Sequence, residues 1–203
     1  MNSPLPAVAS PRSLVIEGRA RRLGDDINTD YIIASSRKKH SVDPHVLRQF
    51  LLEDLDPDFA GSVRDGDILV AGHNFGCGSA MEVAVTVVLA AGIRVVVAKS
   101  FARTYWRNAV NNGLLLITAD TADTADTEAV PEGAPLSLRL AGAQATLHVG
   151  AEGAHVIACE PVPDVVLTIR EAGGLVPYLR QHRQFLKPSR PGSVPGPITP
   201  QPL

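Results

Sequence analysis

The fold is decided by residues 67–82, DILVAGHNFGCGSAME. The apolar run from Ile68 to Ala71 has the length and composition of a short buried strand. Three glycines follow and predict a turn with a bare backbone that a ligand can approach closely: Gly72, Gly76 and Gly78. The chain therefore presents a buried strand that opens directly into a candidate binding turn.

Ser79 comes directly after this turn and stands three residues before Glu82. This is the spacing of a capping box, so the pattern predicts that Ser79 caps a helix over the apolar residues 83–91. The first amides of a helix lack internal partners and the helix dipole is positive there, which stabilises an anion. A serine at this place has two roles that do not exclude each other: it caps the helix, or its alkoxide takes a proton from a substrate carbon.

Other sites built on glycine turns do not match this one. The glycine spacing differs from the G-x-G-x-x-G dinucleotide fingerprint, and no Gly-Lys-Ser/Thr follows, as a P-loop requires. Cys77 is either a thiol activated by the helix N-terminus or a small inert residue. No histidine is fixed beside Cys77 by the sequence, which favours the inert residue.

Composition narrows the classes of function. The chain has 203 residues, 45% of them hydrophobic, and a formal net charge of -2, which argues against nucleic acid and against electrostatic docking on a membrane. The start of the chain, Met1 to Pro11, lacks the pattern of a signal peptide, and we expect a cytoplasmic protein. The two cysteines, Cys77 and Cys159, form no metal motif, so no metal site is predicted in this chain.

The same strand-and-helix pattern continues after the turn. Residues 93–98 and 114–117 predict two further buried strands, separated by a helix over residues 101–112 that Ser100 caps. The alternation of strands and helices from residue 68 to residue 117 predicts a parallel α/β core.

Elements of a different kind flank this core. A strand is predicted over residues 14–23 and contains three arginines, Arg19, Arg21 and Arg22. They form either an anion-binding patch or a solvated strand face, and we favour the solvated face. A polar turn at residues 24–30 leads to a short apolar strand at residues 31–33. The C-terminal part predicts a hairpin, one more strand and two helices, at residues 136–140 with 144–149, 156–158, 163–172 and 175–183.

The predicted domain covers residues 13–186. Residues 1–12 and the proline-rich residues 187–203 are expected to be disordered tails. Residues 118–127 form a low-complexity segment, for which we predict a surface loop or a short acidic helix.

Residues 34–40 form a basic loop without hydrophobic periodicity. This loop is either a solvent-facing connection or a cationic clamp for an anionic substrate, and the composition does not decide between them. Asp43 and Pro44 then predict the start of a helix, with aspartate at the cap and proline at the first helical position.

Several motifs together resemble a known family. These are GDDINTD at residues 24–30, the turn NFGCGS at residues 74–79, AKSFAR at residues 98–103 with RNAVNNG at residues 107–113, and EAGGL at residues 171–175. In this order they are similar to the small subunits of 3-isopropylmalate dehydratase, the swivel domain of the aconitase superfamily. The resemblance covers roughly residues 14–183 and implies an α/β fold with swivelling β/β/α layers.

The resemblance also implies a chemistry and a partner. It implies a large subunit that carries a [4Fe-4S] cluster, in a heterodimer or a heterotetramer, and a dicarboxylic hydroxy-acid substrate. By resemblance Ser79 is the catalytic base, Gly78 and Ala80 bind substrate, and Arg37 and Lys38 lie in the loop that recognises its variable group. Supporting roles in the turn and interface fall to Asn28, Thr29, Asp30, Asn74, Gly76 and Cys77.

One departure from the family pattern concerns the substrate. The family sequence after the turn is Gly-Ser-Ser-Arg-Glu, whereas here it is Gly78-Ser79-Ala80-Met81-Glu82. The missing arginine either is replaced by a cation of the basic loop, or the substrate differs from isopropylmalate. Two functions remain open: one half of an iron–sulfur hydro-lyase for a substituted malate or homoaconitate, and a non-catalytic binding subunit with a degenerate site.

Overall fold

The structure is a computed structural model that describes residues 13–39, 41–119 and 130–182. The two predicted tails and nearly all of the low-complexity segment lie outside the described residues. Seven strands form one sheet in the order β4-β3-β2-β1-β5-β6-β7. Their bounds are β1 Ser13–Arg22, β2 Ile68–Ala71, β3 Val95–Ala98, β4 Leu115–Thr118, β5 Pro135–Ala141, β6 Gln144–Val149 and β7 His155–Cys159.

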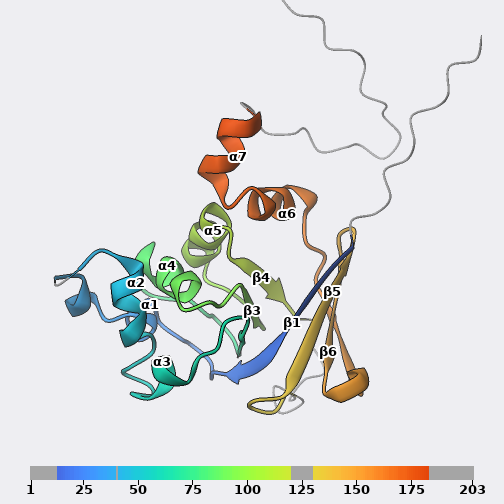
Figure 1. Cartoon of the computed structure of the whole chain (residues 1–203), viewed down its shortest axis with the longest axis horizontal. Helices are drawn as coiled ribbons and strands as arrows, with labels where there is room; N and C mark the ends of the chain where they lie inside the picture. Colours follow the sequence, from blue (N-terminus) through green and yellow to red (C-terminus); the bar gives the residue numbers. More distant parts are fainter. Residues whose placement is uncertain (1–12, 40, 120–129, 183–203) are drawn as a thin grey trace, which may run out of the picture.

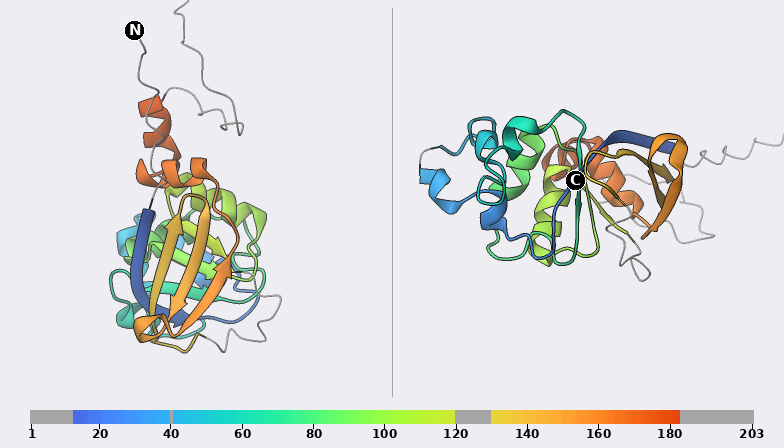
Figure 2. Two further views of the ribbon diagram at one scale, coloured as in Figure 1. Left: turned by 90° about the vertical axis from the view of Figure 1, so that its right-hand side faces the viewer. Right: turned by 90° about the horizontal axis from the view of Figure 1, so that it is seen from below.

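The sheet has a parallel and an antiparallel half that meet at β1. The end of β1, from Ala20 to Arg22, pairs in parallel with β2, which continues in parallel to β3 and β4. The rest of β1, from Ser13 to Arg19, pairs antiparallel with β5, followed by β6 and β7. Figures 1 and 2 show that the sheet curls at β1, so that the antiparallel half folds over toward one face of the parallel half. The predicted hairpin and the final strand are therefore confirmed.

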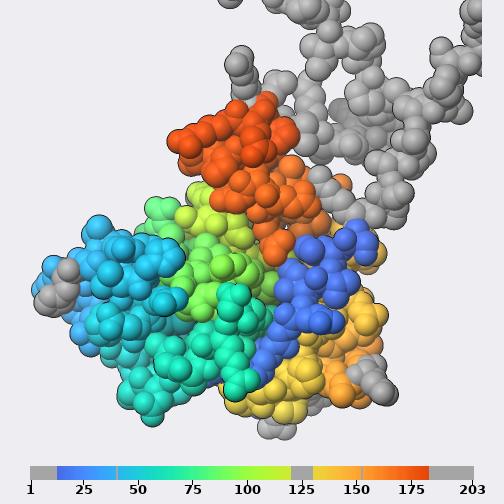
Figure 3. All heavy atoms as spheres, in the orientation of Figure 1, coloured from blue at the N-terminus to red at the C-terminus, as the bar shows by residue number. Residues whose placement is uncertain are grey.

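Helices cover the opposite face of the parallel strands (Figure 2). Their bounds are α1 Thr29–Ile32, α2 Pro44–Leu47, α3 Phe59–Ser62, α4 Val83–Ala90 and α5 Arg103–Asn112, with 3-10 turns η1 Ser35–Lys39 and η2 Arg48–Phe50. The last two helices, α6 Asp164–Glu171 and α7 Leu175–His182, pack on α5 at one end of the molecule, where α7 projects in Figure 3. Among the described helices, none has both the length and the apolar composition needed to cross a bilayer.

Two cores hold the three layers together. Alternate residues of β2 and β3, such as Leu69 and Val96, pack under the helices, while Ile68 and Val95 pack against the antiparallel half. Both faces of the parallel strands are therefore buried, which explains why their sequences are continuous apolar runs. The predicted β/β/α layering is confirmed.

Three predictions about single elements were wrong. Residues 31–33 are not a strand, because Asn28 caps the helical turn α1 by accepting a hydrogen bond from the amide of Asp30. Helix α4 begins at Val83 with Glu82 as its N-cap, so Ser79 does not cap it. Helix α5 begins at Arg103, and no side chain caps it.

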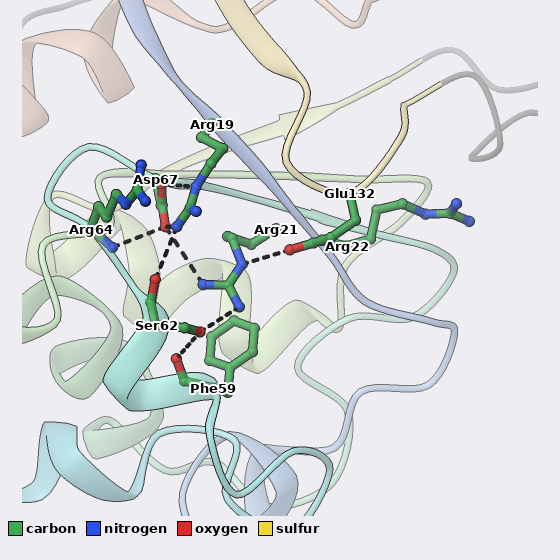
Figure 4. Close-up of polar contacts among 8 residues, drawn as sticks. All are labelled: Arg19, Arg21, Arg22, Phe59, Ser62, Arg64, Asp67 and Glu132. Atoms are coloured by element: carbon green, nitrogen blue, oxygen red, sulfur yellow. Dashed lines mark hydrogen bonds and ion pairs between the residues drawn. The ribbon is translucent and has the colours of Figure 1, made fainter.

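The expectation of a solvated arginine face was also wrong for Arg21, whose exposure is 6% (Figure 4). Its guanidinium lies 3.6 Å from Asp67 and 2.8 Å from Glu132, with its carbon 4.2 Å from the centre of the Phe59 ring. Arg19 donates two hydrogen bonds to Asp67, at 3.1 and 2.7 Å. This cluster fastens the start of β2 to β1 and to α3.

Candidate active site

The site lies where three parallel strands end. The carboxyl ends of β1, β2 and β3 lie at one edge of the sheet, which is the usual place for a ligand in an open α/β fold. The segments that leave these strands are residues 23–30, 72–79 and 99–102. All three segments meet at this edge through hydrogen bonds between their backbones.

The segment after β1 runs beside the glycine turn. The amide of Gly76 donates to the carbonyl of Ile27, at 2.8 Å, and the amide of Thr29 donates to the carbonyl of Cys77, also at 2.8 Å. The side chain of Asn74 adds a bond of 2.8 Å to the carboxylate of Asp26. These bonds hold the two segments together at several points, so the turn has one fixed shape.

The third segment supports the turn from its other side. The amide of Phe75 donates to the carbonyl of Ser100, at 3.0 Å, and the amide of Asn74 donates to the Ser100 hydroxyl, at 2.8 Å. Ser100 thus orients the turn instead of capping α5. The sequence did not reveal this role, because a serine before an apolar-periodic stretch is also the signal of a helix cap.

Two of the glycines are required by this geometry. Gly76 has a φ of 78°, and a Cβ there would lie 2.2 Å from the ring of Tyr105. Gly78 has a φ of 89°, and a Cβ there would lie 2.4 Å from Asn28 Oδ1. Any side chain at either position would combine backbone strain with a steric clash. The Tyr105 ring is buried, with 1% of the residue exposed, and it packs directly beneath Gly76, so it supports the turn from below. Burial also raises the pKa of its phenol.

Ser79 is exposed at the tip of this arrangement. Its carbonyl accepts hydrogen bonds from Thr29 Oγ1, at 3.0 Å, and from the amide of Met81, at 2.8 Å. Its hydroxyl has no hydrogen-bond partner within the residues that the structure describes. The serine is therefore anchored through its backbone while its side chain is free to meet a ligand.

The amides around Ser79 are free as well. Those of Gly78, Ser79 and Ala80 donate to no group in the described part of the chain, and all three residues are exposed. From the sequence we expected an anion to bind at the positive end of a helix that begins at Ser79. Helix α4 begins only at Val83, so the helix end does not lie at this place. Three neighbouring free amides provide the same chemistry, since they can donate to a carboxylate or to an oxyanion.

The Asn28-Thr29-Asp30 turn lies beneath Ser79. Asn28 caps α1, and Thr29, which is 1% exposed, supports the Ser79 carbonyl. The carboxylate of Asp30 accepts hydrogen bonds from the amide and the hydroxyl of Ser35, which ties the basic loop to this turn. The structure thus places the Asn28-Thr29-Asp30 turn next to the glycine turn, as the resemblance grouped them.

The two predicted cations of the basic loop have different surroundings. Arg37 donates two hydrogen bonds to the carboxylate of Glu53, at 2.6 and 2.7 Å, and its guanidinium carbon lies 4.0 Å from the centre of the Phe50 ring. The hydrogen bond to Glu53, together with its negative charge, raises the pKa of Arg37. Lys38 is exposed and its ammonium lies 3.0 Å from the sulfur of Met81. Arg37 therefore has a structural partner, whereas Lys38 faces the site.

The cysteines do not form a metal centre with their neighbours. Within the described ranges, no three His, Cys, Asp or Glu side chains are grouped closely enough to hold a metal ion. The thiol of Cys77 points to the carbonyl of Asp26, at 3.5 Å. Burial raises the pKa of the Cys159 thiol to about 11, as expected for an unreactive cysteine.

Comparisons with known proteins identify the family of this chain. Residues 53–122 match the Aconitase C-terminal domain family. The 3-isopropylmalate dehydratase small subunit 1 of Methanopyrus kandleri is 43% identical over 168 residues, which are 82% of this chain and 94% of that protein. The chain belongs to the family of 3-isopropylmalate dehydratase small subunits.

Other members of this small-subunit family differ in the activity that their names state. The methanogen homoaconitase small subunit of Methanocaldococcus jannaschii is 37% identical over 84% of this chain and 94% of its own length. The solved structure of 3-isopropylmalate dehydratase (leuD) from the same organism has a TM-score of 0.73 at 36% identity, covering 84% of this chain and 96% of that one. The swivel fold of the family is thereby confirmed for this chain.

Proposed function

We propose that this chain is the base-bearing subunit of a hydro-lyase that removes water from a substituted malate and adds it back. The observation that carries the proposal is the exposed Ser79 hydroxyl, held on a rigid glycine turn among three free amides. Family membership supports the reaction class, because the related chains are named as small subunits of 3-isopropylmalate dehydratase or homoaconitase.

In the proposed reaction, Ser79 Oγ acts as an alkoxide and takes the proton from the carbon α to a substrate carboxylate. The electron pair of that C–H bond forms the carbon–carbon double bond as the hydroxyl group leaves the neighbouring carbon, and the reverse steps add water back. The amides of Gly78, Ser79 and Ala80 donate hydrogen bonds to the negative charge that develops there. These donors are fixed before the substrate arrives, since the turn is bound on both sides by the segments after β1 and β3. No reorganisation of the turn is then needed during proton transfer.

The proposal includes a [4Fe-4S] cluster on a large subunit, in a heterodimer or heterotetramer. Such a cluster is held by about four cysteine thiolates, and this sequence contains two cysteines, so its residues do not fit that role. When bound, the cluster supplies a Lewis acid for the substrate hydroxyl. The contribution of this chain is the base and the anion-binding turn.

The competing function is a non-catalytic binding subunit with a degenerate site. Ala80 and Met81, in place of the family's Ser-Arg pair, are the features that favour it. The free hydroxyl of Ser79 and the intact turn favour catalysis.

The test uses the cluster-loaded complex with the large subunit and a panel of 3-isopropylmalate, citramalate and homoaconitate. Formation or loss of the unsaturated acid is followed by ultraviolet absorbance. We expect Ser79→Ala to lower kcat by at least ~1,000-fold, while Ser36→Ala, an exposed serine of η1, leaves it unchanged. Equal activity of the Ser79→Ala complex and the wild type would establish the non-catalytic function instead.

A further inference from the structure

Two residues of the site other than glycine adopt left-handed backbone conformations and contact each other. Asp26, in the segment after β1, has a φ of 53°, and Asn74, in the glycine turn, has a φ of 57°. The side-chain amide of Asn74 donates a hydrogen bond of 2.8 Å to Asp26 Oδ1. Aspartate and asparagine accept this backbone conformation more readily than other side chains, because they can form local hydrogen bonds. Each of the two segments therefore bends at the point where it touches the other.

All three polar groups of Asp26 bind the glycine turn. Its amide donates to the carbonyl of His73, at 2.8 Å, its carboxylate accepts from Asn74, and its carbonyl accepts from Cys77 Sγ, at 3.5 Å. These contacts span residues 73–77 and end two residues before Ser79. Asp26 is exposed, so these contacts hold it instead of burial.

Beyond the two bends, the segments pair in a defined register. Asn28 and Cys77 form a parallel bridge, and Thr29 Oγ1 then donates to the carbonyl of Ser79, at 3.0 Å. An extended chain advances by about 3.3 Å per residue, so pairing shifted by one residue would move Ser79 by roughly that distance. A displacement of ~1 Å at a reacting group can lower a rate about 100-fold. The place of the Ser79 hydroxyl therefore depends on the register of these segments.

We propose that Asp26 and Asn74 are a positioning pair that fixes this register and thereby places the Ser79 hydroxyl, an inference that rests on the proposed function of Ser79 as the base. Both residues act through the backbone of the turn and neither contacts the substrate. Two left-handed bends that bind each other define one relative position of the segments, because a slip would separate the Asn74 amide from the Asp26 carboxylate.

The proposal predicts which substitutions the pair tolerates. Asp26→Asn keeps a side-chain oxygen that accepts from Asn74, so we expect kcat within threefold of the wild type. Asn74→Asp sets two carboxylates against each other, and we expect kcat to fall at least tenfold. The double variant Asp26→Asn with Asn74→Asp exchanges donor and acceptor, so kcat should return to within threefold of the wild type.

The test measures kcat and KM of the cluster-loaded complex for 3-isopropylmalate, with thermal unfolding of each variant. Asn74→Gly removes the side chain but permits the left-handed backbone, so the midpoint of unfolding should stay the same. We expect its kcat to fall at least tenfold while KM changes less than threefold, because the base acts in the transition state.

Asp56→Ala is the matched control, because Asp56 is exposed and its carboxylate also accepts a hydrogen bond from a backbone amide. Its kcat should change less than twofold. Equal kcat values for Asn74→Gly and Asp56→Ala would overturn the inference. A double variant of Asp26 and Asn74 that is no more active than Asn74→Asp would overturn it as well.

Hydrogen exchange of the full chain without its partner tests the pair independently of the role of Ser79. Peptides covering residues 73–79 should exchange at least tenfold faster in Asn74→Gly than in the wild type, while peptides from β3 exchange equally. Unchanged exchange in the turn would contradict the pair, even where kcat has fallen. Faster exchange in Asn74→Gly, together with full activity of Ser79→Ala, would refute the base and leave the register pair supported.

Discussion

At the scale of single residues, the site depends on backbone shapes that few side chains allow. Gly78 has a φ of 89° and lies against the side chain of Asn28. Glycine is therefore required here for two reasons: the backbone conformation disfavours other residues, and a Cβ would clash with Asn28. Gly133 has a similar φ of 77° but open space around it. The two positions therefore separate backbone strain from steric clash.

We predict that Gly133→Ala lowers the free energy of unfolding by about 1 kcal/mol, through backbone strain alone. Gly78→Ala should lower it by at least ~2 kcal/mol and also lower kcat more than tenfold, because Asn28 and the turn must move apart. Urea denaturation and the activity of the complex check both values. Equal losses of stability for the two variants would show that the contact with Asn28 is unimportant.

The sequence indicated Ser79 as a candidate base but did not show how the backbone of Ser79 is held in place. Ser79 and Glu82 have the spacing of a capping box, but they do not form one. The positive φ of Gly78 and the hydrogen bond from the Met81 amide to the Ser79 carbonyl form a bend ahead of the helix instead. A spacing rule carries no information on these dihedral angles. The anion-binding amides of the turn became visible only in three dimensions.

At the scale of elements, the link between β1 and β2 contains a buried charge cluster (Figure 4). Burial acts to raise the pKa of Asp67, but the hydrogen bonds from Arg19 and the Arg64 amide, with the charges of Arg19 and Arg21, outweigh it and lower that pKa. Sequence alternation could not reveal this cluster, since the partners of Arg21 come from distant segments. The prediction of strand β1 was therefore right, whereas the prediction that Arg21 faces solvent was wrong.

The cluster predicts a dependence of stability on pH. Because the pKa of Asp67 is lower in the folded state, its carboxylate stabilises the fold above the unfolded pKa of about 3.9. This contribution is lost as the pH falls through the lower folded-state pKa. We expect the free energy of unfolding to decline below about pH 4, with a shallower decline in Asp67→Asn. An unchanged slope in that variant would contradict the assignment.

Asp67→Asn should also lower stability at pH 7 by about 3 kcal/mol, because it removes the buried carboxylate that accepts two hydrogen bonds from Arg19 and leaves the buried Arg21 with Glu132 alone as its charge partner. Asp58→Asn, an exposed aspartate of the preceding segment, should change it by less than ~0.5 kcal/mol. Chemical denaturation at neutral pH compares the two. A loss in Asp67→Asn no larger than that of the control would mean that the cluster does not support β2.

The helical turn α1 illustrates a limit of pattern reading at this scale. Residues 31–33 are three apolar or aromatic residues, too few to distinguish a strand from a helix. The side chain of Asn28 decides the outcome by capping the turn. As a result Thr29 donates a hydrogen bond to the carbonyl of Ser79, and Asp30 accepts hydrogen bonds from Ser35.

At the scale of the whole molecule, the parallel strands and their helices were predictable from periodicity, whereas the bend at β1 was not. The pattern of β1 predicts a strand without showing that its two ends join different halves of the sheet. The resemblance to the swivel-domain family implied β/β/α layers, which the structure confirms (Figure 1), but it did not show that β1 is shared between the two halves of the sheet. The domain limits at residues 13 and 186 stay predictions.

The architecture also predicts how activity depends on the partner. Two complete cores allow the chain to fold alone, but Ser79 is exposed, so nothing in the described residues covers the site. We expect the isolated chain to show a cooperative thermal transition and no turnover, with activity appearing in proportion to added cluster-loaded large subunit. Turnover by the isolated chain would contradict the prediction that activity requires the large subunit.

The most direct test of the central claim is a single-turnover measurement on the assembled complex. The rate at which enzyme-bound 3-isopropylmalate forms the unsaturated acid is compared between wild type and Ser79→Ala at equal occupancy of substrate. We predict a rate at least ~1,000-fold lower in the variant, because the group that takes the proton is gone. A rate equal to that of the wild type, with substrate bound, would show that Ser79 is not the base.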